Sequence, residues 1–213
     1  MLSSVLFLGL LILNFVISWY NSVTVGRMWS ESKVIGGAFR VYSVAVYIMA
    51  VTGFTMVYGN VLLLILPSVI PLIPELSWIP VDGLRSLTSD MLYVLIITFI
   101  VPSGLILWYG SIVNFVRKRT LTNGLAAGWN TYAQIRNTLH AAKNMPGALG
   151  RIAEALFGKK SKEKDGGAII MFAVLIIILA VLGGWFTASA IMKKADREYD
   201  GLAELDPNMK VFR

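Results

Sequence analysis

Cysteine is absent from this 213-residue chain, and His140 is its only histidine. Without cysteine the chain has no disulfides, thiolate nucleophiles or cysteine-based metal sites. His140 has no second histidine or carboxylate at metal-ligand spacing, and the sequence contains no phosphate-binding loop and no hydrolase or metalloprotease motif. We therefore expect a protein that is not an enzyme and that binds no metal or cofactor.

Charge is also scarce, because charged residues make up 15% of the chain and hydrophobic residues 56%. The mean hydropathy of +0.70 lies above the usual range of soluble domains. About 20 uncharged, mostly apolar residues are needed to span a bilayer as a helix. Four stretches qualify and predict an all-α integral membrane protein with about four transmembrane helices: Met1 to Tyr20, Val41 to Leu66, Met91 to Tyr109 and Ala168 to Met192.

The first apolar stretch lacks the features of a secretory signal peptide. No lysine or arginine precedes Arg27, and the stretch ends in the aromatic pair Trp19 and Tyr20, which suits a membrane interface. We expect this helix to be retained. Four closely spaced prolines follow the second stretch, in residues 67–80, and predict a kinked outer segment there rather than a further span.

Basic residues in short loops predict the orientation, since they tend to stay cytoplasmic. The chain divides into residues 1–110 with the first three helices, a basic loop 111–166, the fourth helix 167–192 and a polar tail 193–213. The loop after the first helix and the loop 111–166 are basic, which places both termini outside and suits a bacterial inner membrane. Lys193 and Lys194, at the exit of the fourth helix, argue for the opposite side.

The loop 111–166 carries ten basic and three acidic residues, an excess equal to the whole net charge of +7. Because this charge flanks membrane spans, we expect anionic lipid headgroups as its partner, and no nucleic acid. Apolar residues recur at helical spacing, and Pro146 is placed to begin a second helix. Two interpretations stay open: a pair of amphipathic helices on the inner leaflet, or a helical hairpin packed on itself or on a partner. The residues expected at the membrane surface are Trp129, Tyr132, Arg151, Ile152, Lys159 and Lys160.

The fourth apolar stretch has a face of small residues, which let helix backbones approach closely in lipid. This face contacts either the other helices of the chain or, through self-association or docking, another protein. Its members are Ala173, Ala180, Gly184 and Ala188.

Neither an ion-coupled transporter nor a catalytic site is indicated, because the four stretches contain no ionisable side chain of the kind that transporters place in the membrane. The preferred hypothesis is a structural or docking subunit of a larger membrane assembly, such as an envelope or secretion machine or a supercomplex. The alternative is a homo-oligomeric pore. Uncharged polar residues would line it: Thr52, Thr55, Asn60 and Ser103.

Overall fold

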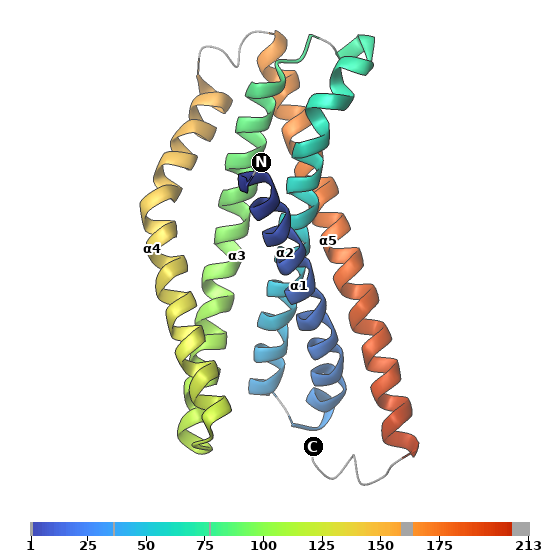
Figure 1. Ribbon diagram of the computed structural model, residues 1–213, viewed down its shortest axis with the longest axis vertical. Coiled ribbons are helices and arrows are strands. Elements are labelled where there is room, and N and C mark those ends of the chain that lie inside the picture. Colours follow the sequence, from blue (N-terminus) through green and yellow to red (C-terminus); the bar gives the residue numbers. More distant parts are fainter. Residues whose placement is uncertain (1, 36, 77, 159–163, 206–213) are drawn as a thin grey trace.

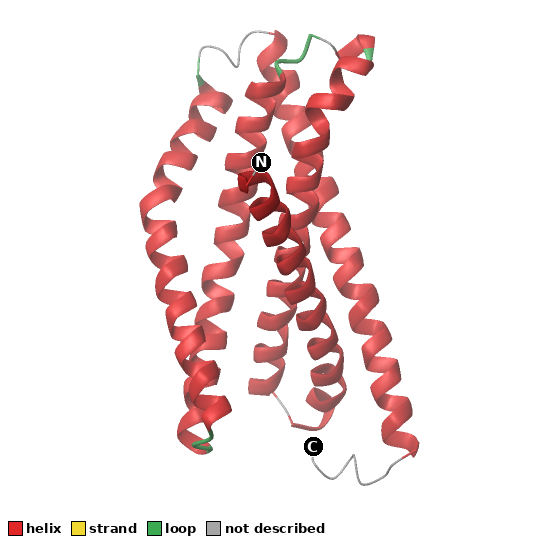
Figure 2. Cartoon of the chain, in the orientation of Figure 1, coloured by secondary structure: helices red, strands yellow, loops and turns green. Residues whose placement is uncertain are grey.

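The computed structural model of this chain describes residues 2–35, 37–76, 78–158 and 164–205. This described part consists of five α-helices and two short 3₁₀ turns, with no strand (Figure 2). The all-helical class predicted from hydropathy is confirmed. The helices are α1 (Leu2–Ile35), α2 (Gly37–Val69), α3 (Val81–Arg117), α4 (Leu121–Phe157) and α5 (Lys164–Leu205).

Within the described residues, the four helices α1, α2, α3 and α5 are long and apolar enough to cross a membrane. The prediction of about four such helices is therefore confirmed. Each helix is longer than the apolar stretch that predicted it, because the helical backbone continues into polar residues at its ends. The candidate spans are Val5–Trp29, Arg40–Leu72, Val81–Arg117 and Gly166–Tyr199.

Successive helices run in opposite directions along the long axis of the molecule (Figure 1). Helices α1, α3 and α5 run toward one end, which we call the lower end, and α2 and α4 run toward the opposite, upper end. The connections between successive helices are short, which favours antiparallel neighbours. Helix α4 lies beside α3 and returns the chain to the end of the molecule where α3 begins (Figure 1).

Helix α2 packs against α1, α3 and α5 and so forms the centre of the bundle. Its Phe54 is fully buried and meets the ring of Phe15 edge-on, with the ring centroids 5.2 Å apart. Small hydroxyl residues of the neighbouring helix are buried too, and Ser22 donates a hydrogen bond to the Ser18 carbonyl at 2.9 Å. Large apolar side chains such as Leu8 are instead exposed. Small and polar groups inside with large apolar groups outside is the arrangement expected where lipid surrounds the bundle.

The proline-rich segment closes the upper end of the bundle. Pro67 lies within the last part of α2, and the 3₁₀ turns Ile70–Leu72 and Pro74–Leu76 follow before α3 begins. Ile70 and Ile79 are buried in a cluster with residues of α3 and α5. Two single turns cannot cross a bilayer, so the prediction that this segment is not a further span is confirmed.

Residues 121–157 form one continuous helix, so the prediction that Pro146 begins a second helix is wrong. Thr120 caps the start of α4 by accepting a hydrogen bond from the Asn123 amide at 3.3 Å, and the helix ends at Gly158. Proline removes one backbone hydrogen bond within a helix, but no turn interrupts the chain on either side of Pro146, and the helix continues through it.

Candidate docking surface and membrane cavity

The described residues contain no group of three or more histidine, aspartate or glutamate side chains that could hold a metal ion. The ring of His140 lies edge-on to Tyr93, with centroids 5.6 Å apart, and its side chain is exposed. We consider two candidate sites, a cavity among α2, α3 and α5 and the outward side of α4.

The small residues of α5 lie against the other helices of the same chain. Ala173, Ala180 and Ala188 are fully buried. A methyl group on Gly184 would lie 2.6 Å from the Thr55 hydroxyl oxygen and 2.8 Å from the Val51 carbonyl oxygen, both in α2. This contact with α2 occupies the place at Gly184 that a docked partner would need.

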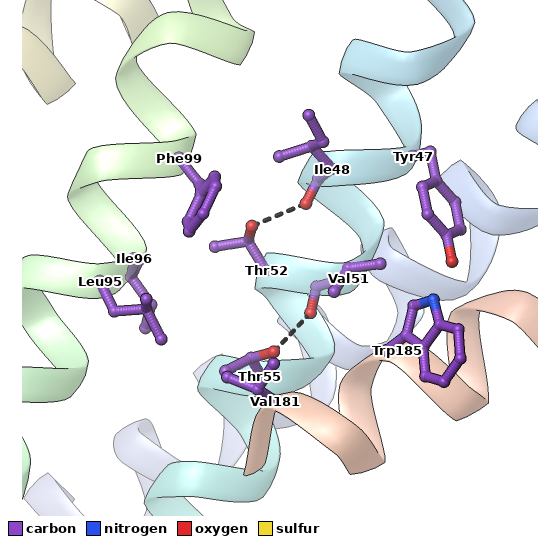
Figure 3. Close-up of a pocket in the computed structure, with 10 residues that line it drawn as sticks. All are labelled: Tyr47, Ile48, Val51, Thr52, Thr55, Leu95, Ile96, Phe99, Val181 and Trp185. Atoms are coloured by element: carbon purple, nitrogen blue, oxygen red, sulfur yellow. Dashed lines mark hydrogen bonds between the residues drawn. The ribbon is translucent and has the colours of Figure 1, made fainter. Parts of the chain in front are cut away.

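A cavity of about 200 Å³ lies where α2, α3 and α5 meet (Figure 3). Two of the residues proposed as pore-lining, Thr52 and Thr55, are on its wall. Their hydroxyls donate to carbonyls of their own helix, Ile48 at 2.7 Å and Val51 at 2.9 Å (Figure 3). The rest of the lining is apolar except for the Tyr47 hydroxyl and the Trp185 indole nitrogen: Tyr47, Ile48, Val51, Leu95, Ile96, Phe99, Val181 and Trp185.

The other two proposed pore residues lie outside this cavity. Asn60 donates from its amide nitrogen to the Met56 carbonyl at 2.8 Å, further along α2. Ser103 is buried in α3. The structure therefore brings Thr52 and Thr55 together but does not join them with Asn60 and Ser103 into one polar wall.

Polar contacts at four levels hold α4 along α3. At the upper end, the guanidinium of Arg151 binds the carboxylate of Asp90 through two hydrogen bonds of 2.7 and 2.6 Å. Below it, the Tyr93 hydroxyl donates to the His140 carbonyl at 3.2 Å. The two lower contacts run from Gln134 Nε2 to the Val101 carbonyl at 3.2 Å, and from Trp108 Nε1 to the Thr131 hydroxyl at 2.9 Å.

Gln134 is the most buried polar side chain of α4. Its Oε1 atom has no hydrogen-bond partner, although the amide nitrogen also reaches the Thr138 hydroxyl at 3.3 Å. Oε1 also lies against Gly104 of α3, where a methyl group would collide with it. The side chain of Gln134 therefore fits against α3 because Gly104 has no side chain.

The apolar stripe of α4 points away from the rest of the chain. We call this surface the outer face of α4. Its large side chains are 56–81% exposed, and the rings of Trp129 and Tyr132 are tilted by 44° to each other with centroids 6.0 Å apart. A groove of about 420 Å³ crosses its middle, between Tyr132, Leu139 and Lys143. The large apolar residues of this face are Leu121, Leu125, Trp129, Tyr132, Ile135 and Leu139.

The residues predicted for the membrane surface do not share one face. Trp129 and Tyr132 lie on the outer face of α4, whereas Ile152 packs inward against the cluster formed by α3 and α5. Arg151 binds Asp90, and Lys159 and Lys160 lie outside the described residues. Trp129 and Ile152 therefore do not lie on one exposed apolar stripe. The side of this long helix that is buried changes along its length.

Sequence reasoning missed the pair of Asp90 and Arg151, which joins residues 61 positions apart. The only signal in the sequence is an acidic residue just before one apolar stretch and a basic residue far along the next segment. That signal does not identify partners without knowledge of the path of α4. No protein-family model, curated protein or solved structure matches this chain.

Proposed function

We propose that this chain is a non-enzymatic subunit of a larger membrane assembly and that it docks there through the outer face of α4. The observation that carries this proposal is that six large apolar side chains and two cations, Arg136 and Lys143, are exposed together along one side of a helix whose opposite side is held by α3. Extended apolar surfaces of this kind mark contacts with proteins or membranes. The small-residue face of α5, the other candidate for docking, is occupied by α2 at Gly184.

The proposed function includes a fifth membrane crossing by α4. Its support is the set of contacts that accompany the apolar part of α3, from Tyr93 to Trp108. Gln134 and Thr131 turn toward α3, while the leucine and aromatic side chains turn outward together with Arg136 and Lys143. Apart from these two cations, polar groups directed to a neighbouring helix and apolar groups directed outward suit a lipid environment.

Five crossings place the two termini on opposite faces of the membrane, in contrast to the expectation of both outside. Within the described residues, the lower end carries nine basic and five acidic residues, and the upper end three basic and five acidic residues. Basic residues favour the cytoplasmic side, so the lower end is cytoplasmic and the N-terminus outside. This orientation places Lys193 and Lys194 on the cytoplasmic side, where their charge suits anionic headgroups of a bacterial inner membrane.

Purification of the tagged chain from its native membrane in mild detergent tests the docking role. The matched variants are Trp129→Ala with Leu139→Ala on the outer face of α4, and Leu8→Ala with Leu13→Ala on the exposed side of α1. We expect the α4 variant to migrate as the free chain and the α1 variant to stay in a larger complex. A wild-type chain that purifies alone, or an α4 variant that keeps the complex, contradicts the proposal.

A homo-oligomeric pore is the second hypothesis from the sequence, and we do not propose it. The hydroxyls of Thr52 and Thr55 are bound to carbonyls of their own helix, and Asn60 and Ser103 lie elsewhere. Among the described residues, these four side chains form no single polar wall of the kind that lines an ion pore.

A further inference from the structure

Two cationic side chains lie on the outer face of α4 near the middle of its length. Arg136 is two residues from Gln134, which binds Val101 in the middle of the apolar part of α3. Lys143 follows seven residues later, and both side chains are exposed and line the groove described above. If α4 crosses the membrane, these two charges lie within or close to the hydrocarbon region and point away from their own chain.

The described part of this chain supplies no partner for either charge. The ion pairs of Arg151 with Asp90 and of Lys194 with Glu198 do not involve Arg136 or Lys143. A charged side chain facing lipid is unfavourable, and such residues usually pair with an opposite charge. We therefore expect Arg136 and Lys143 to form an ion pair with a carboxylate from outside the chain.

A second copy of this chain cannot provide that carboxylate at the same depth. The four candidate spans hold acidic residues only at Asp82 and Asp90 in α3 and at Asp196 and Glu198 in α5, and residues 121–153 of α4 hold none. All four lie within the outer ten residues of their helices, and Asp90 is already bound to Arg151. The partner must be a different protein.

The backbone of α4 is open to a neighbour on either side of the groove. A methyl group added at Gly128, toward the lower end, or at Gly150, toward the upper end, would lie in open space, with no atom of this chain within 4 Å. Glycine within a helix is less stable than alanine, and in membrane helices it permits close approach of a second backbone. The apolar side chains of the outer face would contact the sides of that helix.

We infer that the outer face of α4 binds a membrane-spanning helix of another protein that carries an aspartate or glutamate near the middle of its span. The carboxylate pairs with Arg136 or with Lys143, which lie two helical turns apart on this face. This inference rests on the proposed docking function and names the chemistry of the partner. It requires α4 to lie within the bilayer.

Synthetic transmembrane peptides test the inference with the full-length chain. The chain is reconstituted in neutral phosphatidylcholine vesicles with a donor dye on Ser86→Cys, which is unique because the chain has no cysteine. Acceptor-labelled Leu/Ala peptides carry glutamate, glutamine or leucine at the centre of the span. From the strength of polar contacts between membrane helices, we expect energy transfer to show the glutamate peptide binding about five- to thirtyfold more tightly than the leucine peptide.

Variants locate the binding. Arg136→Gln with Lys143→Gln should remove the preference for glutamate, Arg136→Lys should keep most of it, and Arg117→Gln at the lower end should leave it unchanged. Equal binding of the three peptides, or a preference that survives in the double variant, overturns the inference. A dye on Leu139→Cys that is quenched by quenchers in the headgroup region but not by brominated acyl chains also overturns the inference, because α4 would then lie outside the hydrocarbon region. If the peptides fail while the outer-face variants still release the native complex, the partner chemistry is wrong and the docking function stands.

Discussion

Arg151, near the end of α4, holds the carboxylate of Asp90, near the start of α3, with Nε bound to Oδ2 at 2.7 Å and Nη2 bound to Oδ1 at 2.6 Å. The charge pattern of the loops assigns these residues to opposite faces of the membrane, yet the structure joins them. A two-point contact between a guanidinium and a carboxylate fixes orientation as well as distance. The pair therefore fixes the upper end of α4 against α3.

Removing Arg151 should destabilise the protein more than removing Asp90. The side chain of Asp90 is 14% exposed and that of Arg151 60% exposed, so Arg151→Gln leaves a poorly hydrated carboxylate alone. Asp90→Asn leaves a guanidinium that water can reach. We expect each variant to lower the midpoint of thermal unfolding in detergent by a few degrees, with Arg151→Gln lower. The exchange Asp90→Arg with Arg151→Asp should recover part of the loss, and no recovery would show that the pair is not coupled.

Single cysteines introduced into this cysteine-free chain should report the path of α4. Ser86 and Phe157 lie toward the upper end, and Thr120 and Glu198 toward the lower end. With a membrane-impermeant thiol reagent on intact cells, we expect Ser86→Cys and Phe157→Cys to be labelled and Thr120→Cys and Glu198→Cys to be protected. Labelling of Ser86→Cys with protection of Phe157→Cys would mean that α4 does not cross.

Gly184→Leu should destabilise the fold itself rather than only an assembly. The new side chain would begin 2.6–2.8 Å from atoms of Thr55 and Val51, two of which belong to the backbone and cannot rotate away. Overpacking of this kind costs about 1–3 kcal/mol or more. The matched control is Gly167→Leu, because a methyl group at Gly167 meets nothing within 4 Å. Equal thermal stability of the two variants would contradict the close contact of α2 and α5.

Gln134→Met should change the free energy of unfolding by no more than about 1 kcal/mol, because the lost hydrogen bonds are offset by removal of an unpaired buried oxygen. The two bonds that Gln134 makes are long, at 3.2 and 3.3 Å, and its Oε1 has no partner. Gln134→Glu has nearly the same shape but brings a buried charge, and should be much less stable at neutral pH. Denaturant unfolding in a fixed detergent compares the three proteins, and a tolerated glutamate would show that the site is open to water.

The purified wild-type chain should show no discrete conductance in planar bilayers. Thr52 and Thr55 face a cavity whose remaining lining is mostly apolar, and their hydroxyls already donate to Ile48 and Val51. Unitary currents that shift in Thr52→Leu or Asn60→Leu would favour the pore over the docking subunit. Thr98→Leu, on an exposed part of α3, is the control.

The four apolar helices were predictable because the relevant signal is local. About 20 consecutive uncharged residues are enough to make a span, and a helical backbone then satisfies its own hydrogen bonds. The prolines after α2 likewise excluded a span in that segment, because proline disrupts the backbone hydrogen bonds of the helix in which it lies. Charge patterning is weaker evidence, because it fixes orientation only when the number of crossings is known.

The path of α4 was decided by contacts between distant residues. Gln134 meets Val101 across 33 positions and Arg151 meets Asp90 across 61, and no local pattern indicates either pair. The sequence showed a stripe of apolar residues around Trp129 but not the direction in which the stripe faces. An amphipathic helix in water buries its apolar side against protein, whereas a helix in lipid can expose that side. Likewise, the small residues of α5 implied a close helix contact, and only the packing of Gly184 on Thr55 identified α2 as the neighbour.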